Sequence, residues 1–208
     1  MKLVVLGATG GIGLEIVRQA IERGHSVTAL VRNPAALHRF RDRIAILEGN
    51  LLNPGDMEPA ISGHDAILSG FGPRVPLAKT DKTLMRDFAS TLTGAMAKKG
   101  VKRAVIVSVA FLFKDSIMPP AYLFGRLFFS STVADASAME SVFEGSRLDW
   151  TIVRPPRLTD KALTGKYRAQ EGHLPRFGFA ISRADVADFV LKAVEDPTTV
   201  RKIIGVSN

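Results

Sequence analysis

A glycine-rich loop follows the first apolar run of the sequence. The run Leu3–Leu6 leads directly into Gly7-Ala8-Thr9-Gly10-Gly11-Ile12-Gly13, and apolar residues at helical spacing begin at Ile12. A strand that ends in a glycine turn from which a helix starts gathers backbone N–H groups and the positive end of a helix dipole at one point. The sequence therefore predicts a strand-turn-helix unit whose turn binds an anion.

Short apolar runs recur along the rest of the chain, with helical segments between them. Several are continuously apolar, which is typical of parallel strands that helices cover on both faces. No linker-like stretch divides the 208 residues, so we expect one α/β domain over residues 1–208, a Rossmann-like doubly wound parallel sheet. The expected strands are Lys2–Leu6, Ser26–Val31, Ile44–Leu47, Asp65–Ser69, Arg103–Ser108 and Asp149–Val153.

Three helices are indicated by apolar spacing and by their end signals. The first, over 12–24, and the second, over 84–100, each end in basic residues followed by glycine. The third begins with a capping-box pattern from Ser182 to Asp185 and stops before Pro197. These helices are expected to cover the sheet.

The composition narrows the classes of function. The chain has no cysteine, which excludes disulfides, thiolate metal sites and a cysteine nucleophile, and which suits a reducing cytoplasm. The first apolar run is too short for a signal peptide, and the longest, Ala121–Phe129, is too short for a bilayer, so we expect neither export nor a membrane span. The four histidines have no metal-ligand spacing, so we expect no metal site.

The net charge of +8 favours anionic partners. Lysine and arginine are scattered along the chain and form no basic tract, so we expect no nucleic-acid partner. The oligomeric state stays open at this point.

The spacing and context of the glycines favour a dinucleotide as the anion. One glycine permits a tight turn, one lets a pyrophosphate approach the backbone, and one lets the helix pack closely on the strand. Glycines can also serve a turn for structural reasons alone, but this triplet follows the first strand and opens the first helix of a βαβ unit. The expected cofactor contacts in the loop are Gly7, Thr9, Gly10, Gly11, Ile12 and Gly13.

Arg32, directly after the second expected strand, indicates which dinucleotide binds. An acidic residue at this strand end would accept hydrogen bonds from the ribose hydroxyls of NAD, whereas an arginine pairs with the 2′-phosphate of NADPH. No carboxylate adjoins Arg32 in the segment Leu30–Pro34. We therefore expect NADPH to be preferred over NADH, and a solvated surface arginine is the alternative.

Besides the glycine loop, five other parts of the chain carry motifs of one protein family: Val27–Asn33, Gly49-Asn50, Ser108, Thr151–Pro156 and Ile181–Ala187. Together with the glycine loop they resemble an atypical short-chain dehydrogenase/reductase, most similar to the biliverdin reductase B/flavin reductase group. The likeness covers essentially the whole chain. It implies further cofactor contacts by Asn50, Leu51, Gly70, Phe71, Gly72, Arg74, Ser108 and Pro155.

Typical short-chain dehydrogenases carry a Tyr-x-x-x-Lys pair on one helix, and this sequence has no such pair. Counting back from Thr151, the pair would fall near Ser131 and Asp135. Tyr122, followed four residues later by Arg126, keeps a cation at the right spacing but lies too early, and arginine cannot relay protons as lysine does. Tyr122 is therefore a candidate catalytic residue that we favour as part of a substrate-binding lid or wall.

The missing Tyr-Lys pair is consistent with the resemblance, because members of the biliverdin reductase B/flavin reductase group lack that tyrosine. They reduce conjugated acceptors such as flavins and tetrapyrroles, which can take their proton from solvent. The resemblance implies a catalytic role for Ser108 and a substrate contact for Arg157, although Ser108 could also be a capping residue and Arg157 a surface charge. Val109 stands where mammalian members carry a second hydroxyl, so the resemblance leaves open whether this chain shares their substrate specificity. Aromatic walls for a planar acceptor, where ordinary core packing is the alternative, are expected from Phe71, Phe111, Phe113, Tyr122 and Phe124.

Two classes of function follow. The leading interpretation is an NADPH-dependent reductase of a planar conjugated acceptor of the flavin, quinone or tetrapyrrole class. The missing proton donor supports the alternative, a non-catalytic NADP(H)-binding redox sensor or regulatory module. An isomerase or epimerase that keeps its nicotinamide bound is a weaker third option, because it needs an acid/base pair that the sequence does not offer.

Overall fold

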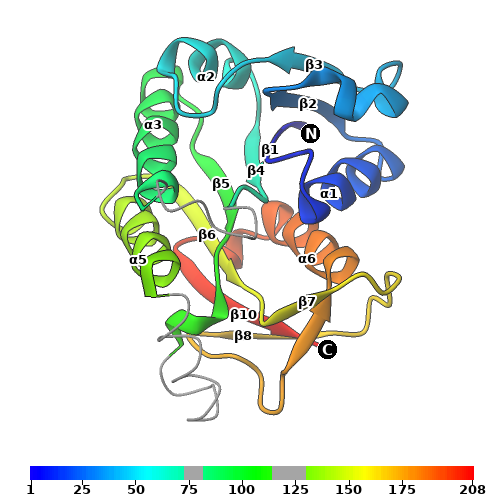
Figure 1. The fold of residues 1–208 in the computed structure, drawn as a ribbon, viewed down its shortest axis with the longest axis vertical. Helices are drawn as coiled ribbons and strands as arrows, with labels where there is room; N and C mark the ends of the chain where they lie inside the picture. Colours follow the sequence, from blue (N-terminus) through cyan, green and yellow to red (C-terminus); the bar gives the residue numbers. More distant parts are fainter. Residues whose placement is uncertain (73–81, 114–129) are drawn as a thin grey trace.

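An eight-stranded sheet forms the centre of the fold (Figure 1). The structure is a computed structural model, and it describes residues 1–72, 82–113 and 130–208. The strand order is β3-β2-β1-β4-β5-β6-β10-β8, and every neighbouring pair is parallel except β10 and β8. The order reverses between β1 and β4, which confirms the predicted doubly wound fold.

The first six strands lie where the apolar runs predicted them, with their ends shifted by at most one residue. Apart from Ala45–Glu48, whose residues are mostly exposed, these strands are largely buried, and a strand covered on both faces leaves few positions for an exposed polar residue. These strands are β1 (Lys2–Leu6), β2 (Ser26–Val31), β3 (Ala45–Glu48), β4 (Ala66–Ser69), β5 (Arg103–Val107) and β6 (Asp149–Arg154).

Four further strands were not predicted. β10 (Lys202–Ser207) pairs with β6 and extends the sheet, and β8 (Arg168–Glu171) runs antiparallel beside β10. β7 (Arg157–Thr159) and β9 (Ala180–Ser182) form a separate two-stranded parallel sheet. All four residues of β8 are exposed, so this strand has no apolar pattern by which to recognise it.

Helices cover both faces of the sheet (Figure 1). α1 (Gly11–Glu22) and α6 (Arg183–Glu195) pack on one face, and α2 (Pro54–Ile61), α3 (Leu84–Lys99) and α5 (Ser130–Glu144) pack on the other. Short 3₁₀ turns are η1 (Pro34–Phe40), η2 (Ala110–Leu112) and η3 (Pro197–Thr199). None of the helices in the described part of the chain is long and apolar enough to cross a membrane.

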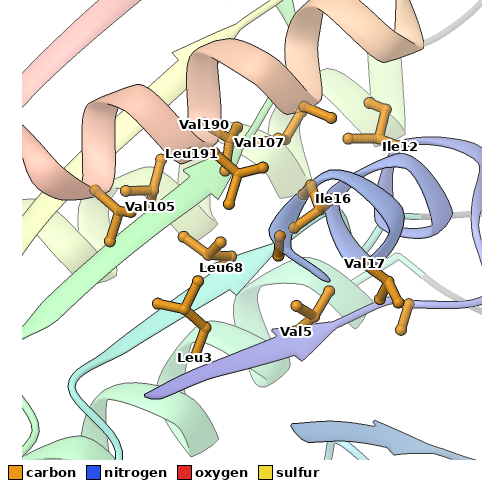
Figure 2. Packing of buried hydrophobic residues seen from close by; sticks show 14 of the residues in the cluster. Leu3, Val5, Ile12, Ile16, Val17, Leu68, Val105, Val107, Val190 and Leu191 are labelled. Carbon is orange, nitrogen blue, oxygen red and sulfur yellow. The ribbon is translucent and has the colours of Figure 1, made fainter. Parts of the chain in front are cut away.

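Alternate residues of β1 enter two separate cores. Leu3 and Val5 pack under α1 and α6, where Figure 2 shows them near Leu68 and the helix residues Ile16 and Val190. Val4 and Leu6 point into the other core, which α2, α3 and α5 cover. This division explains why β1 is apolar at successive positions.

The predicted helix ends are confirmed at two places. Gly100 follows α3 with a φ of +71°, the left-handed conformation that glycine adopts without strain. The Ser182 hydroxyl accepts the backbone N–H of Asp185 at 2.9 Å and so caps α6, as the capping-box pattern indicated.

Candidate functional site

The glycine loop between β1 and α1 leaves no space for side chains at two of its glycines. Gly7 has a φ of +71°, and a Cβ atom there would lie 2.6 Å from the backbone nitrogen of Phe71. A Cβ atom on Gly13 would overlap the carbonyl oxygen of Gly7, because α1 begins directly against the loop. Gly7 therefore permits the tight turn, and Gly13 permits the close approach of α1 to the loop.

The start of α1 presents backbone donors at the carboxyl edge of the sheet. The Gly10 N–H donates to the Gly7 carbonyl at 2.9 Å, and the Leu14 N–H donates to the Gly10 carbonyl at 2.8 Å. The N–H groups of residues 11–13 belong to the first turn, where a helix supplies no acceptor. Gly10 provides no side-chain cap and the first turn has no acidic residue, so this helix start fits a phosphate group.

The segment after β4 forms the neighbouring wall of the loop. A Cβ atom on Gly70 would lie 3.1 Å from the Gly13 nitrogen, so the two backbones are in close contact. The Phe71 ring packs against Phe88 of α3, with 4.7 Å between ring centroids. No atom of the described residues lies within 4 Å of a Cβ atom built on Gly72. This segment thus lies beside the loop, where the resemblance implied cofactor contacts.

Arg32 is exposed directly after β2, the strand beside β1. Within residues 1–72, 82–113 and 130–208, no carboxylate forms an ion pair with Arg32. After β3, Asn50 is exposed, whereas the Leu51 side chain is 7% exposed and packs in the core under α2 and α3. Leu51 can therefore offer a ligand only its backbone.

Ser108 lies at the end of β5, between the ends of β4 and β6. Its side chain is buried, and its N–H donates to the Val153 carbonyl at 2.8 Å. Its hydroxyl has no hydrogen-bond partner among the described residues. The neighbouring Pro155 is buried, and its carbonyl accepts the Ala110 N–H at 3.1 Å. A buried hydroxyl without a partner costs about 1–3 kcal/mol, which makes Ser108 a candidate ligand contact.

The positions expected for a Tyr-Lys pair hold other groups. Ser131 is exposed on α5. Asp135, one turn later, is buried, and its carboxylate accepts the N–H groups of Met85 at 2.8 Å and Arg86 at 3.1 Å. Asp135 therefore caps α3, and its carboxylate is occupied by structural hydrogen bonds.

A buried ion pair that the sequence reasoning did not single out lies beside Phe113. The Arg154 guanidinium lies 4.5 Å from the centroid of the buried Phe113 ring, and its Nε donates to the Glu140 carboxylate of α5 at 3.1 Å. Arg157 is exposed at the start of β7. One side of Phe113 is thus packed against protein.

Some expected site residues lie beyond what the structure describes. Arg74, Tyr122 and Phe124 fall outside the described residues, and of Phe111 only the backbone, within η2, is described. Within the described ranges, no group of three or more His, Asp or Glu side chains could hold a metal ion.

A family profile described as NAD(P)H-binding matches residues 7–197, from the first glycine of the loop to the residue after α6 and its cap. The chain belongs to this NAD(P)H-binding family. The close glycine contacts and the open first-turn N–H groups of the loop fit the pyrophosphate of such a nicotinamide dinucleotide.

Two curated relatives extend over nearly the whole chain. The photosystem II assembly factor Ycf39 of Synechocystis is 26% identical over 97% of this chain, which spans 61% of the length of Ycf39. The uncharacterized chloroplastic protein At2g34460 of Arabidopsis thaliana is 30% identical over 99% of this chain and 76% of its own length.

Solved structures share the fold over the full chain. A candidate NAD-dependent epimerase/dehydratase from Bacillus halodurans has a TM-score of 0.83 and 26% identity, and 94% of it is covered. A short-chain dehydrogenase/reductase from Veillonella parvula in complex with NADP has a TM-score of 0.81, 20% identity and 94% coverage. The anaerobilin reductase ChuY from Escherichia coli O157:H7 has a TM-score of 0.80, 21% identity and 97% coverage. These neighbours confirm the resemblance to atypical short-chain dehydrogenases/reductases at the level of fold.

Proposed function

We propose that this protein is an NADPH-dependent reductase that transfers a hydride to a planar conjugated acceptor of the flavin, quinone or tetrapyrrole class. The observation that carries the proposal is the Ser108 hydroxyl, which is buried at the carboxyl edge of the sheet and has no partner among the described residues. Ligands bind at this edge in doubly wound sheets. Because no described residue accepts a hydrogen bond from it, the hydroxyl can donate to an acceptor oxygen or nitrogen.

The absence of a Tyr-Lys pair from the expected positions favours a conjugated acceptor. Hydride transfer to an isolated carbonyl leaves an alkoxide, which needs a positioned proton donor. A conjugated ring spreads the negative charge, so the hydride can come from NADPH and the proton from solvent, giving NADP⁺ and the reduced acceptor. One structural neighbour, ChuY, is by name an anaerobilin reductase, which supports the reductase class.

Arg32 supports NADPH over NADH. It is exposed beside the strand that carries the cofactor loop, and no described carboxylate pairs with it. Its guanidinium can therefore form a charge-assisted hydrogen bond with a 2′-phosphate, a group that NADH lacks.

A second candidate is a non-catalytic NADP(H)-binding regulatory protein. Asp135 favours it, because the position where typical members place a catalytic lysine is taken by a carboxylate that caps α3. The relative Ycf39 is by name an assembly factor. In this role the bound cofactor would set the conformation or the partner affinity of the chain.

Turnover assays separate the two candidates. Purified protein is mixed with NADPH and, in turn, FMN, dichlorophenolindophenol, a quinone and biliverdin, and the nicotinamide absorbance is followed. We expect oxidation of NADPH with at least one acceptor, and a turnover about tenfold lower in Ser108→Ala, as for the loss of one hydrogen bond. Ser62→Ala, which removes an exposed hydroxyl after α2, is the matched control. Tight NADPH binding without turnover of any acceptor would overturn the reductase and leave the regulatory protein.

A further inference from the structure

The side chain of Arg183, the first residue of α6, lies over the start of α1. A Cβ atom built on Gly11 would lie 2.5 Å from Cδ and 2.7 Å from Nε of Arg183. Gly11 is the first residue of α1, and its N–H belongs to the open first turn of the cofactor loop. An arginine from the far end of the chain thus reaches the phosphate-binding side of the fold.

Asp160 holds this arginine from one side. In the segment between β7 and β8, the Asp160 carboxylate accepts a hydrogen bond from Nη1 of Arg183 at 2.5 Å. No described residue accepts from Nε or Nη2 of Arg183. A guanidinium donates along two edges, so the pairing with Asp160 leaves the Nε–Nη2 edge available for a second oxyanion.

The electrostatics at this point favour an anion between Arg183 and α1. A cation beside the positive end of a helix is unfavourable unless a negative charge lies next to both. The first turn of α1 has no acidic residue and Gly10 has no side-chain cap, so α1 does not supply that charge itself. Asp160 pairs with Arg183 only on its Nη1 side, and because the Asp160 side chain is 90% exposed, solvent weakens this ion pair.

We propose that Arg183 binds the pyrophosphate of the nicotinamide dinucleotide through its Nε–Nη2 edge, opposite the backbone donors of the glycine loop, and that Asp160 is a positioning residue for it. The proposal rests on the cofactor of the family and not on the acceptor or on the preference for NADPH. Because NADH and NADPH share the pyrophosphate, Arg183 contributes equally to both, whereas Arg32 contributes to NADPH alone.

Binding titrations with three ligands test this assignment. NADPH, NADH and adenosine 2′-monophosphate, which has no pyrophosphate, are titrated against wild type, Arg183→Ala, Arg183→Lys and Arg147→Ala. Arg147 is an exposed arginine just before β6, at the opposite edge of the sheet, and serves as the matched control. We expect Arg183→Ala to lower the affinities for NADPH and NADH by the same factor, about tenfold, and to leave the affinity for the monophosphate unchanged. Lysine should recover part of the loss, because it keeps the charge without the fork.

The Gly11 contact provides a second, independent variant. The methyl group of Gly11→Ala would displace the Arg183 side chain, so this single substitution should lower the affinity for both dinucleotides. Added to Arg183→Ala, it should cause little further loss of affinity. Unchanged dinucleotide affinity in a folded Arg183→Ala protein would overturn the proposal. An equal loss of monophosphate affinity would also overturn it, because it would assign Arg183 a structural role, as would losses that simply add in the double variant. If the wild-type protein bound neither dinucleotide, the assignment of a nicotinamide cofactor would itself be wrong.

Discussion

Asp135 of α5 caps the first turn of α3 by accepting the backbone N–H of Met85 at 2.8 Å. The neighbouring Arg86 N–H donates to the other oxygen of the same carboxylate. Thr83, the residue before α3, makes no side-chain capping bond, so a residue of another helix performs that function. This link fastens two helices of one face to each other.

Replacing Asp135 should therefore destabilise the fold. Asp135→Ala leaves the buried N–H of Met85 and the part-buried N–H of Arg86 without their acceptor, and we expect a loss of about 1–3 kcal/mol in the free energy of unfolding. Asp135→Asn keeps one carbonyl acceptor and should lose less. Urea unfolding measures both, with Asp42→Ala as the control, since the Asp42 side chain is 86% exposed. Equal midpoints for Asp135→Ala and the control would refute the capping role.

Five of the first six strands could be predicted because burial on both faces requires a nearly continuous apolar sequence, whereas β3 is mostly exposed and was predicted from its short apolar run alone. β10 could not, because Gly205 interrupts its apolar run, and the reason for that glycine is distant: a Cβ atom there would overlap the His173 carbonyl oxygen. β8 is polar and exposed, and it exists because β10 offers it a partner edge. Strands that depend on such non-local pairing leave little local pattern.

The candidate site shows the same division. The loop glycines were predictable because turn geometry and helix packing act within a few residues. The position of Arg183 over Gly11 depends on how α6 packs against α1, and the cap from Asp135 depends on how α5 meets α3. Neither has a local sequence signal, so only the three-dimensional structure reveals them.

Gly13 should tolerate no side chain. Its Cβ atom would overlap the Gly7 carbonyl oxygen, so Gly13→Ala must push α1 away from the loop, and we expect loss of measurable NADPH binding together with a lower melting temperature. Gly94→Ala is the matched control, because Gly94 lies within α3 and no atom of the part of the chain that the structure describes lies within 4 Å of its Cβ position. That variant should gain about 0.5–1 kcal/mol in helix stability. Normal NADPH affinity in Gly13→Ala would contradict the assigned helix approach.

Arg32 should determine the preference between the two dinucleotides. Arg32→Ala removes a charge-assisted hydrogen bond of about 1.5–3 kcal/mol, so NADPH affinity should fall about 10- to 100-fold while NADH affinity stays the same. Fluorescence titration of both cofactors against wild type and the variant measures the two changes. An unaltered NADPH affinity would mean that Arg32 is a solvated surface residue.

Asp185 should make the stability of the fold depend on acid pH. Its buried carboxylate accepts hydrogen bonds from the N–H groups of Thr164 and Gly165, both at 2.9 Å, and from Nδ2 of Asn208 at 3.1 Å. Burial alone would raise the pKa of Asp185, but these hydrogen bonds outweigh it and hold the pKa below its ordinary value of 3.8.

Because the pKa of Asp185 is lower in the folded state, its ionised form adds stability above the ordinary pKa of 3.8 and loses that contribution as the pH falls below it. We expect Asp185→Asn to lower the free energy of unfolding by about 1–3 kcal/mol at neutral pH. The difference from wild type should shrink as the pH falls through and below the ordinary pKa of 3.8. Urea unfolding at a series of pH values measures the difference, with Asp42→Asn as the exposed control. A gap between wild type and Asp185→Asn that stays constant across the window would show that the carboxylate contributes through its shape and not through its charge.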